Sequence, residues 1–382
     1  MFSVKKALKE NPKLLVIFGL LVLLFTATSI LQPSFRDPGT LTNTMRWIGL
    51  YGIISIGVGF VIIAGGIDLS IGSLIALSGV MLPMLLKGDI FFSEPLPVPF
   101  AFGLVLLISL GIGFFHGVMV TKLGLQPFLV TLCGLFIYRG LARAAGNDQT
   151  QGFGGDFGGL KDALVKDKLF DFVPMSFVVL VIIGVVAAVV LNKTVFGRYL
   201  LAVGHNEEAA KFSGIKTDRV KIAAYMICSL LGGFAGMLFV LDTNGATPSS
   251  FGNFYELYAI AGAVLGGCSL RGGEGAIFGV ICGAALVQVA EKAVFFLGVE
   301  EKSKFTVIGI FILVGVIADE LFRRLSDRRS GAGGGGDPPS SGQSKPTSSA
   351  AMLGGAVALQ KLNQIEEKTE ETEEAGEGFG FD

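Results

Sequence analysis

Charged residues are scarce in this chain: Asp, Glu, Lys and Arg make up 16% of its 382 residues, against 51% hydrophobic residues. It has two histidines and four cysteines, with no C-x-x-C pair to indicate a metal or redox centre. It also lacks the G-x-x-x-x-G-K-[ST] phosphate loop, the H-E-x-x-H metal motif and the G-x-S-x-G nucleophile motif. These absences argue against a soluble domain with mixed faces, and they predict no catalytic residue, no metal site and no cofactor bound by this chain.

Long apolar runs are present instead, and a run of about 20 residues crosses the ~30 Å hydrocarbon core of a bilayer as a helix. We therefore expect an all-α polytopic membrane protein with about ten transmembrane helices, some of them short or broken. Seven runs are long enough to cross without interruption: 14–31, 47–64, 98–120, 172–191, 222–241, 276–297 and 305–321. Three runs are shorter or interrupted: 71–86, 127–145 and 257–268.

The positions of lysine and arginine predict the orientation, because short cytoplasmic loops retain these residues. With ten spans and the N-terminus inside, sixteen of them fall in cytoplasmic segments and eight to ten in external ones. Both termini are therefore expected in the cytoplasm. The first run is too long for a signal peptide and has no clear cleavage site, so we interpret it as a retained first span.

The chain changes character near residue 330. Residues 1–329 form the expected transmembrane domain, whereas 330–382 is a Gly/Ser/Pro linker followed by an acidic tail with nine Asp and Glu against three Lys. Low hydrophobicity and high charge predict disorder in this tail. It is either a solvated tail without an essential role or a docking segment for a soluble partner.

Polar and glycine residues interrupt two of the apolar runs. Gly65-Gly66 is followed by Asp68 and Ser70, and Gly266-Gly267 ends a second run, 201 residues later. A carboxylate and helix-breaking glycines at membrane depth must be shielded by protein, so these segments are candidates for the substrate path and for corresponding broken elements in two halves of the fold. Asp68 could bind substrate hydroxyls, or it could cap the helix that begins near Ser70.

The hydrophilic segment 192–221, expected in the cytoplasm, contains a short helix-forming block. Asn206 can cap this helix, and Glu207 and Glu208 occupy its first turn, where the helix dipole favours carboxylates. Ser213-Gly214 then ends it. A capped helix of this kind is suited to insertion into a groove of a partner protein.

Three segments of the chain resemble the signature segments of one transporter family. They are GGIDLSIGS at 65–73, AVGHNEEAAKFSGI at 202–215 and YELYAIAGAVLGGCSLRGGEGAIFG at 255–279. In this order and spacing they resemble the simple-sugar permeases of bacterial ABC importers, which are the membrane subunits of the ribose, galactose and xylose type. The similarity extends from about residue 12 to residue 322.

The resemblance implies a multi-pass protein of the bacterial inner membrane, paired with a second permease as a homodimer or heterodimer. Each permease would bind a cytoplasmic ABC ATPase, which holds ATP-Mg, and would receive a monosaccharide from a periplasmic or lipid-anchored binding protein. No nucleic-acid partner is expected. Residues matching the family's ATPase-coupling loop, taken together with the two glutamates of its helix, are Gly204, Asn206, Glu207, Glu208, Ala209, Ala210, Ser213 and Gly214.

The chain departs from the family's usual pattern at Tyr258, where aspartate is usual, and at His205, where glycine is common. Tyr255 and Glu256 are expected at the external mouth of a short span, with Asn244 nearby. An aromatic ring with polar groups suits a sugar, although an interfacial tyrosine and a solvated carboxylate would have the same sequence pattern.

The two histidines, His116 and His205, are expected to be isolated, with no partner for a metal or a proton relay. A nucleoside or another small solute is the alternative substrate. A secondary transporter is the less favoured alternative class, because the interiors of the spans contain almost no carboxylates or histidines for ion coupling.

Overall fold

The computed structural model describes residues 12–90 and 94–296, together with the single residues 298, 306, 309, 310 and 313. All of them belong to one unit of the chain, Met1–Arg324. The predicted span 305–321 lies almost wholly outside the described residues. The same is true of the predicted domain boundary at 329–330 and of the acidic tail.

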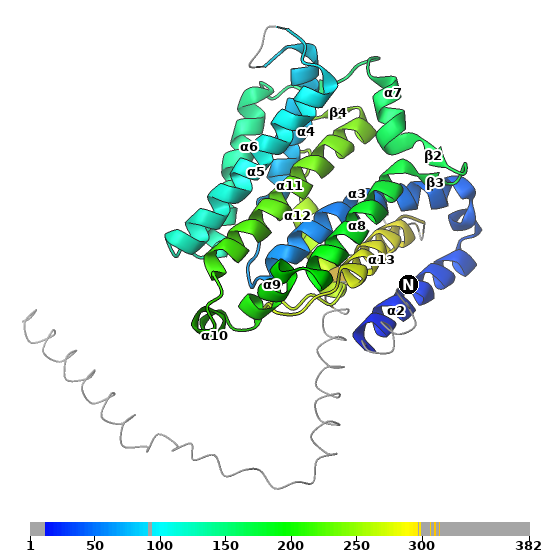
Figure 1. Ribbon diagram of the computed structural model, residues 1–382. Coiled ribbons are helices and arrows are strands. Elements are labelled where there is room, and N and C mark those ends of the chain that lie inside the picture. Colours follow the sequence, from blue (N-terminus) through cyan, green and yellow to red (C-terminus); the bar gives the residue numbers. More distant parts are fainter. Residues whose placement is uncertain are drawn as a thin grey trace, which may run out of the picture. The chain divides into compact units, whose positions relative to one another are not determined.

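Apolar helices make up most of the described chain (Figure 1). Six are long and apolar enough to cross a membrane: α3 (Pro38–Ile63), α5 (Val98–Lys122), α6 (Pro127–Ala145), α8 (Met175–Lys193), α11 (Thr217–Thr243) and α13 (Ile277–Phe296). Three further apolar helices are α2 (Pro12–Leu31), α4 (Ile71–Lys87) and α12 (Tyr255–Leu265). Nine of the ten predicted apolar runs are thus confirmed as helices.

The helices form an inner and an outer set. In α3, 89% of an 18-residue apolar stretch is buried inside the protein. The buried share of the corresponding stretch is 22% in α5 and 28% in both α6 and α8. The outer helices keep large apolar side chains at their surface, including Phe100, Phe136 and Ile182. Such a surface is costly in water and suited to lipid, so the distribution agrees with a membrane location.

Glycine allows neighbouring helices of the bundle to approach closely. A β-carbon at Gly113 would lie 2.6 Å from the backbone oxygen of Tyr225, where α5 crosses α11. A β-carbon at Gly262 would lie 3.1 Å from Cα of Ala284, where α12 packs on α13. Both glycines belong to small-xxx-small pairs in the sequence, which is the pattern expected for close contacts between membrane helices.

The segment between α6 and α8 is partly ordered by short elements. Strand β1 (Gln151–Gly152) pairs antiparallel with β4 (Gly245–Ala246), and β2 (Lys168–Leu169) pairs antiparallel with β3 (Val173–Pro174). Between β1 and β2 lie α7 (Gly158–Lys161) and a π-helical turn, and a 3₁₀ turn (Pro33–Arg36) joins α2 to α3. The β1–β4 pair holds this segment against the end of α11.

The hydrophilic segment before α11 contains two helices, where the sequence predicted one. The predicted helix is α10 (Glu207–Phe212), and it is preceded by α9 (Val195–His205). Thr194 caps α9 by accepting a hydrogen bond from the backbone N–H of Gly197. Figure 1 shows α9 and α10 at one end of the bundle, and α7 and β4 at the other.

Candidate functional site

The boundaries of α10 are those that its sequence predicts. The Asn206 side chain accepts a hydrogen bond from the backbone N–H of Ala209 at 2.9 Å. The hydroxyl of Ser213 donates to the carbonyl of Ala209 at 2.9 Å, and Gly214 follows with φ +82°. Ala210 is buried against the body of the protein, whereas the Phe212 side chain is 92% exposed. This exposed aromatic side chain was missed by the sequence reasoning.

Ion pairs connect α10 to its own last turn and to α11. Glu207 pairs with Lys211 at 3.1 Å and with Lys221. Burial alone would raise the pKa of Glu207, but hydrogen bonds and positive charges from Lys221 and Lys211 outweigh it and hold the pKa below its usual value. The lysine on α11 thus fixes the start of α10.

The three signature segments meet at a contact made by backbone atoms, which we call the glycine junction: Ile63, Gly65, Gly204, Gly272 and Gly273. The N–H of Gly273 donates to the carbonyl of Ile63 at 2.9 Å. A β-carbon at Gly204 would collide with that same carbonyl and with the backbone of Gly273. A β-carbon at Gly272 would lie 2.7 Å from the carbonyl oxygen of Gly204 and 2.9 Å from the backbone of Gly65.

At Gly204 and Gly272 only a residue without a β-carbon permits this approach. The glycine junction therefore brings the end of α9 onto the break after α3 and onto the loop before α13, with no side chain between them. Nothing in the sequence pattern indicates that these segments touch.

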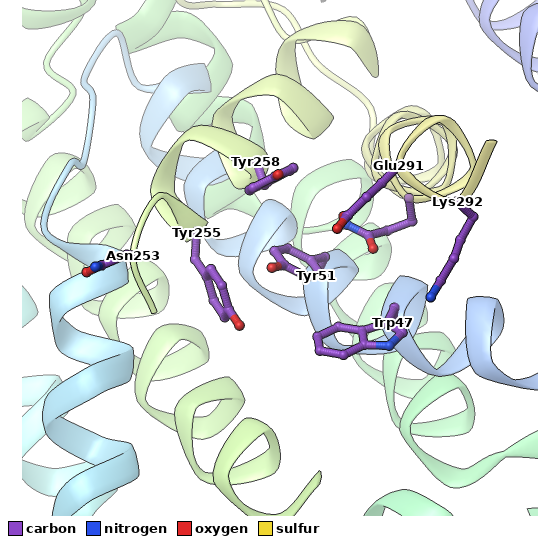
Figure 2. Close-up of a pocket in the computed structure, with 8 residues that line it drawn as sticks. Trp47, Tyr51, Asn253, Tyr255, Tyr258, Glu291 and Lys292 are labelled. Carbon is purple, nitrogen blue, oxygen red and sulfur yellow. The ribbon is translucent and has the colours of Figure 1, made fainter. Parts of the chain in front are cut away.

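A cavity of about 280 Å³ lies between α3, α12 and α13. Its lining residues, which define the aromatic cavity, are Trp47, Tyr51, Asn253, Tyr255, Tyr258, Gln288, Glu291 and Lys292. Figure 2 shows the Tyr51 ring in the middle of the group. Its centroid lies 5.0 Å from that of Tyr255, 5.5 Å from that of Tyr258 and 6.0 Å from that of Trp47.

Polar interactions hold the turn that leads into the aromatic cavity. The Arg139 guanidinium, at the end of α6, donates to the carbonyls of Pro248 and Phe251 at 2.9 and 2.6 Å. Tyr258 lines this cavity at the position where the family resemblance leads one to expect aspartate.

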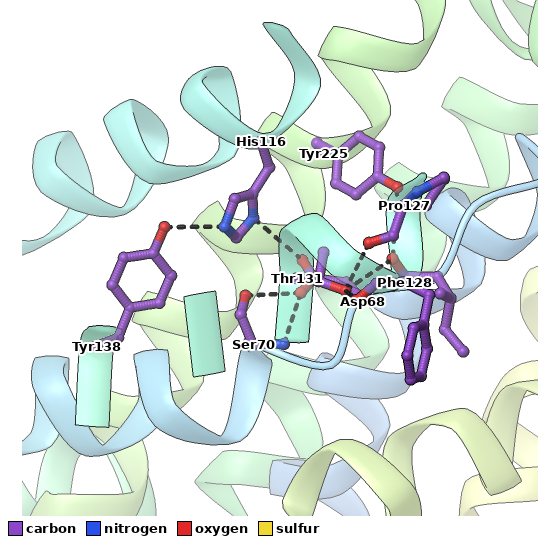
Figure 3. Close-up of polar contacts among 9 residues, drawn as sticks. Asp68, Ser70, His116, Pro127, Phe128, Thr131, Tyr138 and Tyr225 are labelled. Carbon is purple, nitrogen blue, oxygen red and sulfur yellow. Dashed lines mark hydrogen bonds and ion pairs between the residues drawn. The ribbon is translucent and has the colours of Figure 1, made fainter. Parts of the chain in front are cut away.

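The aspartate after the first break belongs to a buried polar cluster, made up of Asp68, Ser70, His116 and Tyr138 (Figure 3). Asp68 Oδ1 accepts hydrogen bonds from the backbone N–H and the hydroxyl of Ser70 at 2.9 and 2.6 Å. These bonds close the turn that precedes α4. Asp68 Oδ2 faces His116 Nδ1 at 4.0 Å, and both side chains are fully buried. Tyr138 is hydrogen-bonded to His116 Nε2 at 2.8 Å.

The expectation that His116 is isolated was therefore wrong. Three features of the helix packing place it: α5 carries it inward, α6 supplies Tyr138, and Gly134 leaves room for the imidazole, since a β-carbon there would lie 2.7 Å from Nε2. Neither Asp68 Oδ2 nor His116 Nδ1 has a hydrogen bond of full geometry to the described residues. The Cys228 thiol of α11 also faces Asp68.

The residues predicted for the substrate path lie in several places. Gly65 belongs to the glycine junction, Asp68 and Ser70 to the polar cluster, and Tyr255 to the aromatic cavity. The other five residues have separate neighbours. Gly66 packs on the Tyr225 hydroxyl, Asn244 donates a hydrogen bond to the carbonyl of Gly154, and Glu256 is buried against Gly72. Gly266 lies on Gly279, and Gly267 lies near Ile17. The structure does not bring the nine residues into one site.

Sequence reasoning missed most residues of the aromatic cavity. Its members on α3 are separated by four positions and those on α12 by three, and on α13 two members follow Gln288 by three and by four positions. These spacings place side chains on one face of a helix. They could have been noticed, but which three helix faces meet is a tertiary fact.

Comparison with known proteins gives consistent matches. A family model described as the permease component of branched-chain amino acid transport systems matches residues 40–316. The chain is 36% identical to the ribose import permease protein RbsC of Bacillus subtilis, over 78% of this chain and 90% of that protein. It is 28% identical to the fructose import permease protein FrcC of Rhizobium meliloti, over 84% of this chain and 88% of that protein.

A third relative is the autoinducer 2 import system permease protein LsrC of Yersinia enterocolitica, which is 31% identical over 84% of this chain and 85% of that protein. No solved structure matches the chain.

Proposed function

The chain belongs to the family of transport-system permease components, and from this membership we propose that it forms the path by which an ABC importer carries a monosaccharide inward. A separate ATPase supplies the energy. The relatives named above for ribose and fructose import support a sugar as the cargo. A nucleoside or another small solute is the alternative, since one relative is named for autoinducer 2.

As a permease, the chain is a multi-pass protein of the bacterial inner membrane and a transporter component rather than an enzyme. We propose ten spans: the nine apolar helices and the run 305–321. With both termini inside, α9 and α10 face the cytoplasm and the segment that carries β1 and β2 faces outward. The bias of lysine and arginine toward the cytoplasmic segments supports this orientation.

The glycine junction is the observation that carries the proposal. The α10 helix, capped by Asn206, is the element we propose to enter a groove of the ATPase, with Phe212 as its exposed anchor. The glycine junction joins the neighbouring α9 to both broken segments of the membrane region. A displacement of α9 and α10 by the ATPase must therefore move the end of α3 and the loop before α13, because no flexible side chain lies between them.

The partners follow from this arrangement. A cytoplasmic ATPase that binds ATP-Mg would drive α10, and an external binding protein, periplasmic or lipid-anchored, would deliver the sugar. A second permease, identical or related, would complete the path. Import against a hundredfold gradient requires roughly 2.7 kcal/mol per sugar, which a coupled ATPase can supply.

The test is uptake by proteoliposomes that contain the permease, its ATPase and its binding protein. Gly204→Ala should leave complex formation intact but reduce uptake per ATP hydrolysed at least tenfold. Gly140→Ala is the control, because no described atom outside its own stretch of α6 lies within 4 Å of its β-carbon position. Phe212→Ala should weaken ATPase binding without affecting the fold, since the side chain is exposed. Wild-type coupling in both Gly204→Ala and Phe212→Ala would contradict the proposal.

The buried Asp68–His116 pair is the one feature described above that a proton-coupled secondary transporter could use, so this alternative class needs its own test. Proteoliposomes without the ATPase distinguish the two classes. Sugar uptake driven by a proton gradient alone would replace the importer with a secondary transporter, whereas strict dependence on ATP supports the importer.

A further inference from the structure

The aromatic cavity contains an unsatisfied polar group. Gln288 is 2% exposed, and its Nε2 has no hydrogen-bond partner among the described residues. A buried amide N–H without an acceptor is costly, so native proteins rarely leave one without a protein, water or ligand partner. Because Gln288 lines the aromatic cavity, the missing acceptor belongs to what occupies it.

The remaining lining residues indicate the chemistry of that occupant. Trp47, Tyr51, Tyr255 and Tyr258 supply flat apolar faces whose edges carry N–H and O–H groups. Such faces pack against the C–H surface of a saturated ring, and their polar edges, together with the Asn253 amide, can bond to hydroxyl groups around that ring.

Charge and size restrict the occupant further. Glu291 and Lys292 bring one negative and one positive group to the lining, so the aromatic cavity has no net charge to attract an ion. Its volume of about 280 Å³ lies at the small end of the ~300–1,000 Å³ range of ligand pockets, which suits a small ligand such as a single ring.

We propose that the aromatic cavity binds a single neutral hydroxylated ring of the monosaccharide class, with Gln288 donating to a hydroxyl or ring oxygen and Tyr258 packing on the ring. The assignment rests on the proposed function and names its substrate site. It places the sugar beside the middle of α3, whereas the glycine junction lies at the C-terminal end of this helix. Tyr51 and Ile63 are twelve residues apart on this helix, or roughly 18 Å.

The chain provides its own reporter for a test. Trp47 is the only tryptophan in the sequence, and it lines the aromatic cavity. Its fluorescence can be followed in the full-length permease, purified in detergent without the ATPase or binding protein, while ribose, fructose, glucose, uridine or leucine is added into the millimolar range. We expect a saturable change with at least one of the three sugars and none with uridine or leucine.

Variants distinguish this site from others. Gln288→Leu should weaken sugar binding about tenfold, as expected for the loss of one buried hydrogen bond, and Tyr258→Ala should also weaken it. Tyr199→Phe, on α9 and outside the aromatic cavity, is the matched control. The same variants are then measured for the KM of uptake in the complete reconstituted system, where both Gln288→Leu and Tyr258→Ala should raise it.

Failure of the inference and failure of the proposed function have different signatures. Normal ATP-driven sugar uptake by Gln288→Leu and Tyr258→Ala, with an unchanged KM, would overturn the site while leaving the function in place. A saturable signal with uridine in place of the sugars would overturn the monosaccharide assignment. Absence of ATP-driven sugar uptake by the unmodified complex would overturn the proposed function itself.

Discussion

Removing the Asp68 carboxylate should destabilise the protein strongly, and the magnitude can be estimated from its contacts. Two hydrogen bonds from Ser70 end on Oδ1, and hydrogen bonds to charged groups contribute about 1.5–3 kcal/mol each. Asp68→Ala also leaves the buried His116 without its facing carboxylate. The two hydrogen bonds from Ser70 together therefore correspond to a loss of roughly 3–6 kcal/mol in the free energy of unfolding.

Asp68→Asn separates the two contributions. The amide retains an oxygen that can accept from Ser70 but removes the carboxylate opposite His116, so it should cost about 1–3 kcal/mol. Equilibrium unfolding in mixed micelles, with thermal melting in detergent as a second measurement, gives these differences. Ser109→Ala is the control, since this buried hydroxyl bonds only to the Val105 carbonyl one turn earlier among the described residues, and it should cost no more than about 1 kcal/mol.

A double-mutant cycle tests the reasoning itself. Asp68→Asn and His116→Leu are measured singly and together. If the two side chains interact as their 4.0 Å separation indicates, the coupling energy should be between about 0.5 and 3 kcal/mol. Additive effects within about 0.3–0.5 kcal/mol would mean that the pair does not interact and that His116 is held only by Tyr138.

Three further predictions concern packing, pH and the tail. Gly262→Leu should destabilise the protein by about 1–3 kcal/mol, because the larger side chain would push α12 away from α13. Gly103→Leu is the control, since the space around this glycine is open. Equal melting temperatures of the two variants would contradict the packing argument. The pKa of Glu207 is lowered from its ordinary value of 4.5, so its pairing with Lys221 and Lys211 stabilises α10 fully at pH values above 4.5. This contribution is lost as the pH falls through the lowered pKa. Hydrogen exchange of α10 should show this loss in the native chain but not in Glu207→Gln. Deletion of 330–382 should leave transport intact, and failure of the truncated chain to assemble with its partners would show that the tail is required.

Much of the local structure could be predicted because it depends on short stretches of sequence. The length of an apolar run decides whether a helix can cross the bilayer, and nine predicted runs are helices. The start of α10 is equally local, since Asn206 caps a backbone N–H three residues away. The α9 helix was missed because its 11 residues are too few to cross the bilayer and lie within a segment that is hydrophilic overall.

The sites could not be predicted in the same way, because they depend on contacts between residues far apart in the chain. Asp68 and His116 are 48 positions apart, and nothing near either residue indicates that they face each other.

From the sequence alone it follows that this protein belongs in a membrane, that nine of its apolar runs are helices, and that three segments mark it as a permease, since hydropathy and short motifs are local properties. Which helix faces meet follows only from the packing of the whole bundle. Close packing at glycine places Gly204 on Ile63 and Gly273 and leaves room for His116 beside Asp68, and the packing of α3, α12 and α13 gathers four aromatic rings around one cavity. The physical reason is that burial and hydrogen bonding are satisfied across the whole bundle, whereas the sequence shows only what each segment requires.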